Sequence, residues 1–412
     1  MLAYNRLDQK GKIRRFMYML FVLTVGLFIM SYKNALSSYN STIMALSYKY
    51  GFASRGLLGS FYRLVDKILP VDMRNYESAL HFTLVMTVMF FLFLLFFAWF
   101  VQSHCREEYL LYAQCILAAF FVLVVSSFSG DHNFGRVDMY MMAFSILGVV
   151  LLISEKAEIL LIPICALAVM VHQGYVFMYF NIILVLLLYK MLSRQGKQKR
   201  YYGILFILCF VTGSALFVWF EFLSRTNGSA IFDAVKADAV ALSYQGEYHV
   251  TLLEHEVLGT DLATEEWSYH LKNFVEAPIF LFFFLPFLVY GIKMCVNIIH
   301  AAVSKIDKWK YVFVAIGSFT LLPIFALKVD FGRWFIALMV YYCVIFLALL
   351  AMGDTLVETQ VQASMHRLKT QHKWAELLAV YPLVFMPIWD VNMGHVIAAF
   401  SHIVNVTLLH WW

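Results

Sequence analysis

Residues 129–189 read SGDHNFGRVDMYMMAFSILGVVLLISEKAEILLIPICALAVMVHQGYVFMYFNIILVLLLY. A short polar turn at 154–158 separates two apolar runs, each long enough for one arm of a helical hairpin. If that turn lies at one membrane face, a rise of about 1.5 Å per residue carries Arg136 about 28 Å and His172 about 24 Å toward the opposite face. The stretch therefore predicts two membrane helices that bring an arginine and a histidine to one level, where ionisable groups indicate a site.

The composition of the whole chain is that of a membrane protein. Of its 412 residues, 62% are hydrophobic and 14% are charged, and the mean hydropathy is +0.75. Apolar runs recur to the end of the sequence, so we expect residues 1–412 to form a single all-α, multi-pass membrane domain. The net charge of +5 is explained by membrane topology, and we expect no nucleic-acid partner.

Twelve apolar segments are expected to span the membrane, and the first is retained because no small-residue cleavage site closes it. An even number of spans places both termini on one side. Lysine and arginine number 19 on that side and 12 on the other, which predicts cytoplasmic termini in a bacterial cytoplasmic membrane. The expected spans cover residues 16–30, 80–101, 109–128, 136–153, 157–173, 174–191, 202–223, 274–292, 310–327, 333–352, 376–389 and 394–410.

Two long loops, 32–79 and 224–273, face outward in this layout. The first contains apolar residues at helical spacing from Leu57 to Leu69, which predicts an amphipathic helix lying in the outer interface. The second has three basic and eight acidic residues, with several aromatic ones. Its aromatic and carboxylate residues fit two alternatives equally well, a surface that binds sugars and a solvated acidic loop.

The tripeptide Phe-Gly-Arg occurs twice, ending at Arg136 and at Arg333. Asp131 and Asn133 precede the first copy, and Asp330 precedes the second. Counted from the cytoplasmic ends of their helices, both arginines rise to the level of the histidine. Two guanidinium groups and an imidazole at one level match the oxygens of a diphosphate.

Each of these residues also has a structural interpretation. An arginine at the outer end of a helix serves as an interfacial anchor, and His172 would cap the hairpin. Arg55, in the segment GFASRGLLG, fits either a lipid headgroup or a substrate. Asp131 and Asp330 are expected as partners of the arginines. The six cysteines lie in spans or near cytoplasmic ends, which predicts neither a disulfide framework nor a zinc site.

The order and spacing of these residues resemble the Wzy-type polysaccharide polymerases, particularly their EpsG-like branch. In that branch an Asn-x-x-Arg-Gln element precedes an Ala-rich span, and a His followed by small residues closes the next span. Residues 133–136 match the first element, and Ala168 and His172 match the second. Arg333 falls where a later outer arginine is expected.

This sequence departs from the family pattern at two places. Val137 stands in the position of the Gln, and residues 173–175 replace the small pair. The matching core covers about a sixth of the chain.

The resemblance implies a GT-C-like or Wzy-like glycosyltransferase that joins polyprenyl-diphosphate-linked oligosaccharide repeat units into an O-antigen, capsule or exopolysaccharide on the outer face of the membrane. Arg136 and Arg333 would stabilise the leaving diphosphate without a metal or other cofactor, and His172 would be the general base. Besides the lipid-linked donor and membrane lipid, a chain-length regulator and a flippase of the same pathway are implied as partners. The remaining expected substrate contacts are Arg55, Asp131, Asn133, Tyr175 and Asp330.

Four alternatives stay open. A carboxylate of the 224–273 loop is a second candidate for the base. A single-sugar transferase that uses a polyprenyl monophosphate would carry acidic residues early in the first outer loop, where Asp66, Asp72 and Glu77 lie. A flippase would line a central cavity reachable from both faces. A membrane acyltransferase would use a buried histidine but leave the two arginines without a role.

Overall fold

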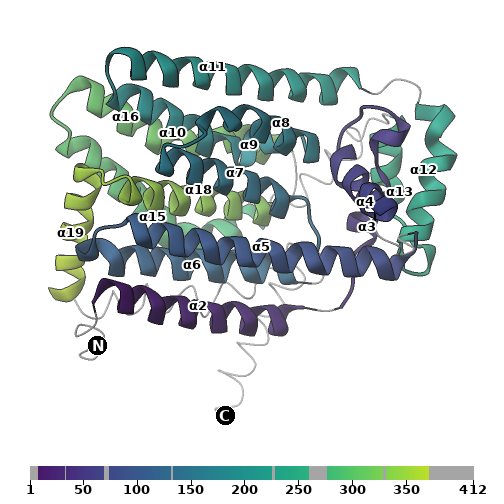
Figure 1. Ribbon diagram of the computed structural model, residues 1–412, viewed down its shortest axis with the longest axis horizontal. Helices are drawn as coiled ribbons and strands as arrows, with labels where there is room; N and C mark the ends of the chain where they lie inside the picture. The colour runs from purple at the N-terminus through teal and green to yellow at the C-terminus, as the bar shows by residue number, and fades with distance from the viewer. Residues whose placement is uncertain are drawn as a thin grey trace, which may run out of the picture.

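The structure is a computed structural model, and its described residues form a helical bundle. They are 86% helical and include no strand, which confirms the predicted all-α fold for this part of the chain. Most helices run side by side between two ends of the bundle (Figure 1). The described residues are 8–32, 34–68, 74–130, 133–224, 228–258, 276–327 and 331–370.

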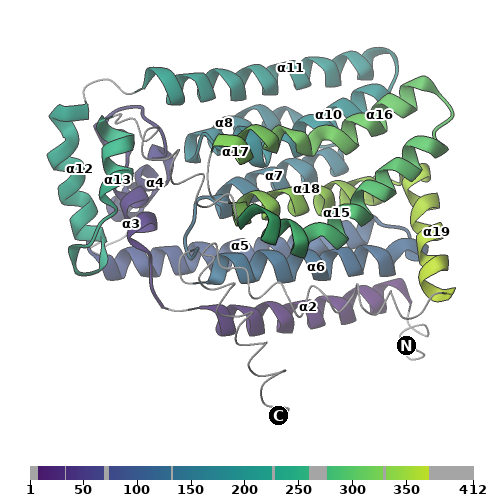
Figure 2. The same ribbon diagram turned by 180° about the vertical axis from the view of Figure 1, so that it is seen from behind.

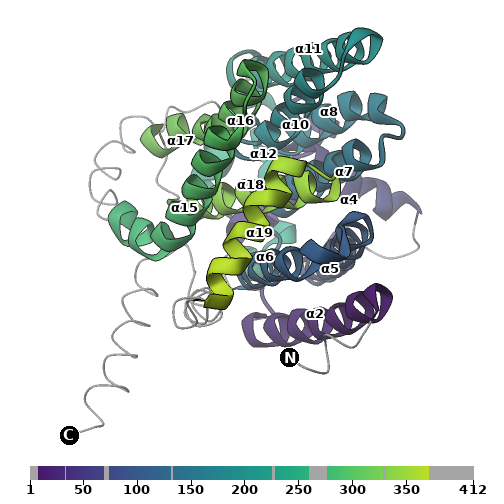
Figure 3. The same cartoon turned by 90° about the vertical axis from the view of Figure 1, so that its left-hand side faces the viewer.

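The two ends of the bundle are built differently. One end carries a group of short helices that we call the cap (Figure 1). The other end is crossed by α19, which Figure 3 shows lying over the ends of the bundle helices. The cap consists of α3 (Ser38–Ala45), α4 (Gly56–Ile68), α12 (Gly228–Leu242) and α13 (Val250–Leu253), and α19 spans Thr355–Thr370.

Seven helical segments of the described chain are long and apolar enough to cross a membrane, and three shorter apolar helices accompany them. Each predicted span between residues 16 and 352 overlaps with one of these segments, although the span predicted at 274–292 shares only its second half with Phe284–Ala301. The predicted spans 376–389 and 394–410 lie outside the described residues, so the count of twelve stays a prediction. The seven segments are Gln9–Ser31 (α2), Tyr76–His104 (α5), Glu107–Ser129 (with α6, Leu110–Ser129), Gly196–Leu223 (with α11, Gly196–Val218), Phe284–Ala301 (in α15, Glu276–Ala301), Lys305–Phe325 (with α16, Lys305–Ile316, and α17, Leu322–Leu327) and Gly332–Ala351 (in α18, Phe331–Ala351).

The three shorter apolar helices are α7 (Asp138–Ser154), Glu158–Val171 (with α8, Leu161–Val171) and α10 (Phe180–Ser193). The short helix α9 (Tyr175–Met178) precedes α10.

Two of the short helices, α7 and α10, lie inside the bundle, and most of their residues are buried. α7 has 17 residues and α10 has 14, which give lengths of about 26 and 21 Å, less than the ~30 Å of a hydrocarbon core. They pack near α18, in which buried residues make up 89% of the apolar window, against 11% in α2 and 22% in the α11 segment. α2 and α11 occupy opposite edges of the bundle (Figures 1 and 2). The neighbouring helices therefore cover α7 and α10, whereas the third short segment exposes Leu160 and Leu167 by 47% and 37%.

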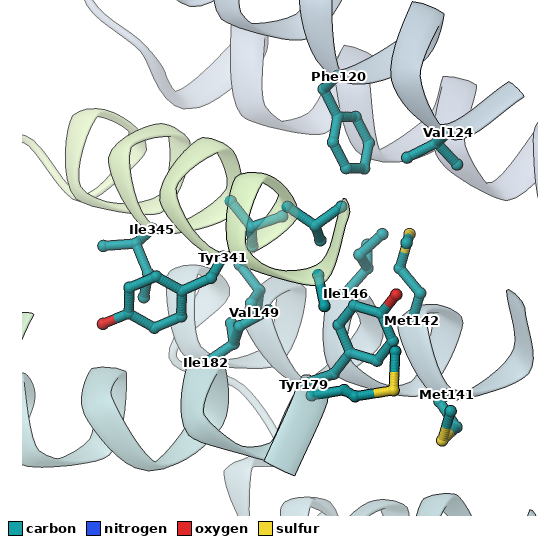
Figure 4. Close-up of a cluster of buried hydrophobic side chains, with 14 of the residues drawn as sticks. Phe120, Val124, Met141, Met142, Ile146, Val149, Tyr179, Ile182, Tyr341 and Ile345 are labelled. Atoms are coloured by element: carbon teal, nitrogen blue, oxygen red, sulfur yellow. The ribbon is translucent and has the colours of Figure 1, made fainter. Parts of the chain in front are cut away.

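Large apolar side chains fill the core where α6, α7, α10 and α18 meet (Figure 4). The hydroxyl of Tyr341, in the middle of this core, donates to the carbonyl of Val314 at 2.5 Å, so its burial leaves no unsatisfied donor. Close packing of this kind holds the helix ends at fixed positions. The labelled residues are Phe120, Val124, Met141, Met142, Ile146, Val149, Tyr179, Ile182, Tyr341 and Ile345, each at most 1% exposed.

The predicted hairpin is present as α7 and α8. Glu155 and Ala157 in its turn have left-handed φ angles of 54° and 52°, which reverse the chain in a few residues. Lys190 of α10 donates to Glu155 at 3.0 Å and to Glu158 at 3.2 Å. These ion pairs join the turn to the next helix at the α19 end.

The predicted amphipathic helix is α4. Leu58 and Tyr62 are buried, whereas Phe61 and Leu64 on the other side are 42% and 50% exposed. Gly59 packs against the backbone of α3, and a side chain at this position would collide with the carbonyl oxygens of Met44 and Leu46. Within the cap, α4 therefore packs closely against α3, while its position in the membrane interface stays a prediction.

The second outer segment is more ordered than an acidic loop. Its described part, 228–258, forms α12 and α13 with short connecting turns. Val235, Ala239 and Leu242 recur at helical spacing and are buried, an apolar pattern that the abundance of carboxylates concealed. Asp238 accepts hydrogen bonds from Arg63 and from the hydroxyl of Tyr50. One acidic residue of this segment thus links α12 to the first outer segment.

Candidate functional site

The two Phe-Gly-Arg segments meet in one pocket at the capped end. Arg136 enters it from the turn before α7, and Arg333 enters from the first turn of α18. The cavity has a volume of about 10 Å³, room for about one water molecule. The structure therefore brings together two arginines far apart in the sequence, around a pocket that is nearly closed. Its lining residues are Ser127, Phe128, Asn133, Arg136, Asp138, Tyr179, Arg333 and Ile336.

Arg333 is held by a buried carboxylate. Its Nη2 donates to both oxygens of Asp138 at 2.8 Å, and its Nε donates to Oδ1 at 3.3 Å. Arg333 is 9% exposed and Asp138 is 2% exposed. Asp138 also opens α7, where the helix dipole favours a negative charge. The partner expected from the sequence, Asp330, lies outside the described residues and stays a prediction; among the described residues, Asp138 is the carboxylate that pairs with Arg333.

The glycine of the first Phe-Gly-Arg segment sets the position of Arg136. Gly135 has a φ of +84°, and a Cβ there would lie 2.7 Å from the side chain of Thr83. The carbonyl of Phe134 accepts a hydrogen bond from the side-chain amide of Asn40 at 2.7 Å. A left-handed residue in so little space requires glycine. The sequence thus fixes a tight turn that is tied to α3 and ends in the arginine.

A third arginine, Arg55, lies beside this pair. Its backbone φ of 59° is left-handed, its Nη1 donates to the hydroxyl of Tyr39 at 2.9 Å, and its Nε lies 3.3 Å from Oε1 of Glu256. The Tyr39 ring lies within cation–π range of both Arg55, at 5.9 Å, and Arg136, at 5.6 Å. We call Arg55, Arg136 and Arg333 the arginine cluster.

The charges of this cluster influence one another. Burial disfavours the charged form of Arg55, but the nearby Glu256 carboxylate and the Tyr39 side chain together outweigh this effect and raise the pKa of Arg55 above its usual value. The positive charge of Arg333 acts in the opposite direction and lowers the pKa of Arg55. Three arginine side chains gathered at one end of the bundle form a site that is suited to an anion.

Two residues of the second outer segment contact the cluster and were not singled out from the sequence. The ring of His249 meets that of Tyr39 edge-on at 5.6 Å, and burial, with the charge of Arg55, lowers the pKa of His249. The side chain of Glu256 is only 4% exposed. A histidine before a short helix and one carboxylate among eight give no local signal, so only the tertiary contacts reveal them.

His172 lies near the cluster but does not line the pocket. It ends α8, and its Nδ1 accepts a hydrogen bond from the backbone N–H of Gly174 at 2.7 Å. The next residue, Gln173, accepts from the hydroxyl of Ser54 at 2.6 Å, directly before Arg55. A neutral imidazole that accepts at Nδ1 carries its proton at Nε2. In this arrangement the second nitrogen of His172 is a hydrogen-bond donor.

The remaining predicted contacts are divided between the pocket and the core. Asn133 is 3% exposed and lines the pocket, and its Oδ1 has no hydrogen-bond partner among the described residues. Tyr175 is fully buried, and its hydroxyl accepts from Ser145 at 3.1 Å. Asp131 lies outside the described residues, as Asp330 does. Tyr175 therefore packs in the core next to the site and not at the pocket.

Within the described ranges, no three His, Cys, Asp or Glu side chains are arranged to hold a metal ion. Comparisons with known protein families, with characterised proteins and with solved structures find no match to this chain. The nature of the site therefore rests on its own geometry. That geometry consists of three arginines, of which Arg333 is buried and Arg55 and Arg136 are half-buried, two carboxylates that hold two of them, and a tyrosine ring between Arg55 and Arg136.

Proposed function

We propose that this protein is a membrane glycosyltransferase that polymerises polyprenyl-diphosphate-linked oligosaccharide units. The observation that carries the proposal is the convergence of Arg136 and Arg333 on one pocket, with Arg55 joined to them through Tyr39. Guanidinium groups bind phosphate oxygens in pairs, and a diphosphate offers oxygens to more than one of them. Twelve spans, a GT-C-like architecture, cytoplasmic termini and an outward-facing cap belong to this proposal.

In the proposed reaction an acceptor sugar hydroxyl attacks the anomeric carbon of the donor. The bond from that carbon to the diphosphate oxygen breaks, and the leaving diphosphate takes the electron pair. Arginines already fixed at this position stabilise the developing negative charge more than the ground state, which lowers the barrier. The proton of the acceptor hydroxyl passes to a base of the protein.

The hydrogen bonds of the structure favour a different division of roles from the one expected from sequence. His172 accepts a backbone N–H at Nδ1, so its Nε2–H suits a contact to a phosphate oxygen. Glu256 lies against Arg55, and a diphosphate that takes over Arg55 would release this carboxylate. Glu256 is then the base in our proposal, in agreement with the alternative that a carboxylate of this segment accepts the proton.

Substrate binding requires the pocket to open. A volume of about 10 Å³ is that of about one water molecule and cannot hold a diphosphate. Arg55 and Glu256 belong to the outer segments that form the cap, whereas Arg136 and Arg333 belong to the ends of the bundle helices. Movement of the cap away from these helix ends would open the space between the three arginines.

Of the acidic residues that a single-sugar transferase would use, Asp66 and Glu77 do not line this pocket. Asp66 is 3.9 Å from Arg74, Glu77 is exposed in the first turn of α5, and Asp72 lies outside the described residues. A flippase would need a path from both ends, whereas the arginine cluster lies at the capped end. The polymerase therefore accounts for more of the observed contacts.

The test uses the purified full-length protein with a synthetic polyprenyl-diphosphate-linked repeat unit. A ladder of products that differ by whole repeat units supports the polymerase. Transfer of one sugar from a polyprenyl monophosphate donor would identify a single-sugar transferase, and movement of the donor across liposomes without a new bond would identify a flippase. Arg74→Lys is a matched control, because the Arg74 side chain is 85% exposed and has no role in the proposed reaction.

A further inference from the structure

A second pocket lies at the α19 end, between α2 and α5, far from the arginine cluster. It is a groove of about 470 Å³. Lys10, Ile13, Arg14 and Met17 are spaced so that they share one face of α2, and Trp99 and Ser103 share one face of α5. The groove thus has two basic residues at its outer rim and apolar side chains below them.

Polar contacts fix the two walls of this groove. Lys12, on another face of α2, forms an ion pair with Glu107 at 2.7 Å. The side-chain amide of Gln9 donates to the carbonyl of Cys105 at 3.0 Å. These contacts tie the start of α2 to the end of α5, so the groove is a built feature and not a chance separation of two helices.

The two basic residues of the groove are available to a ligand. Lys10 and Arg14 are both exposed, and in the part of the chain that the structure describes no carboxylate forms an ion pair with either. Their spacing of one helical turn places two positive charges side by side. A single phosphate group could contact both of them.

An apolar stripe leads away from the groove along α5. Its residues follow each other at alternating spacings of four and three, so that they form one line on the helix. Fourteen residues of helix extend for about 21 Å, more than the ~15 Å of one membrane leaflet. The stripe consists of Val85, Met89, Leu92, Phe96 and Trp99, which are 57%, 59%, 54%, 44% and 49% exposed.

We propose that this groove binds one anionic phospholipid. Its phosphate lies at Lys10 and Arg14, the indole of Trp99 lies at the boundary between headgroup and acyl chains, and one acyl chain follows the stripe on α5. Tryptophan is common at this level of a membrane, and basic residues between membrane helices bind anionic headgroups on the cytoplasmic side. The site is independent of the proposed glycosyltransferase activity.

The test measures quenching of Trp99 fluorescence by phosphatidylglycerol with brominated acyl chains. The full-length protein is reconstituted in phosphatidylcholine vesicles, and a Trp99→Phe variant supplies the background of the other tryptophans. We expect phosphatidylglycerol to quench Trp99 at a lower mole fraction than brominated phosphatidylcholine does. In the Lys10→Gln/Arg14→Gln variant, the preference for phosphatidylglycerol over phosphatidylcholine should fall by about 30-fold, which is the effect of two basic residues near a membrane surface.

Matched variants separate a specific site from diffuse attraction. Lys197→Gln/Lys199→Gln removes the same charge from exposed positions at the start of α11 and should leave the preference unchanged. The Lys10→Arg/Arg14→Lys variant keeps both charges and should retain the preference for phosphatidylglycerol. This variant controls for a change in membrane insertion caused by substitution at these positions. Equal quenching by the two lipids, or equal loss of preference in the Lys197 and Lys199 variant, would overturn the proposal.

Discussion

The buried pair of Arg333 and Asp138 supports a quantitative prediction. Three hydrogen bonds of 2.8 to 3.3 Å join the two side chains, and both residues are at most 9% exposed. Removing one partner of a buried ion pair deprives the other charge of the group that compensates its burial, which costs about 3–5 kcal/mol. We therefore expect Arg333→Gln and Asp138→Asn each to lower the free energy of unfolding by this amount.

The double variant distinguishes a paired charge from two independent ones. Arg333→Gln/Asp138→Asn removes both charges, so its loss of stability should be smaller than the sum of the two single losses by about 3 kcal/mol. Unfolding in mixed micelles, driven by a denaturing detergent, measures these differences. The exposed pair of Lys12 and Glu107, 2.7 Å apart, is the control, with an expected coupling of at most about 1 kcal/mol. Additive losses at Arg333 and Asp138 would refute the reasoning.

Three further predictions concern topology, pH and the base. Single cysteines at the exposed positions Ser229 and Ser304, in a cysteine-free background, should react with an impermeant thiol reagent from opposite sides; labelling of both from outside would contradict the layout. Burial and the charge of Arg55 lower the pKa of His249, so folding favours its neutral form and the stability of the protein should fall as pH drops below about 6.5. The thermal unfolding temperature of His249→Gln should fall less than that of the wild type over the same pH range. An identical fall in both proteins would exclude this histidine as the cause. If the purified protein has the proposed activity, His172→Gln should keep the loss of turnover at low pH, whereas Glu256→Gln should lower turnover by ~100-fold or more. The opposite pattern would restore His172 as the base.

Periodicity and charge predicted the helices well because both act locally. The polar turn at 154–158 and the apolar runs on either side gave the α7–α8 hairpin, and the spacing from Leu57 gave α4. Helix α12 was missed, since Lys236 and Asp238 lie between the buried Val235 and Ala239 and the whole segment is rich in carboxylates. Composition alone does not reveal which carboxylates are used for packing.

The sequence predicted part of the site, because the tripeptide Phe-Gly-Arg occurs twice and its two arginines were expected at the same level of the membrane. Counting along helices placed Arg136 and Arg333 at the same end, because helical rise is uniform. It could not identify Asp138 as the partner of Arg333, because that contact depends on how α7 and α18 pack. The roles of Tyr39 and Glu256 depend in the same way on the cap, whose arrangement no local pattern specifies.

Recognition of a diphosphate by the arginine cluster is tested most directly by donor binding to the Arg136→Lys variant. Lysine keeps the charge but not the planar fork. Loss of one hydrogen bond to a charged group costs about 1.5–3 kcal/mol, which corresponds to a dissociation constant about 10- to 100-fold higher for a polyprenyl-diphosphate-linked oligosaccharide. The measurement is a titration of purified wild type and variant, with Arg74→Lys as control and insertion verified for each. We expect Arg136→Lys alone to bind the donor more weakly, and equal affinity in all three proteins would contradict a diphosphate site at this cluster.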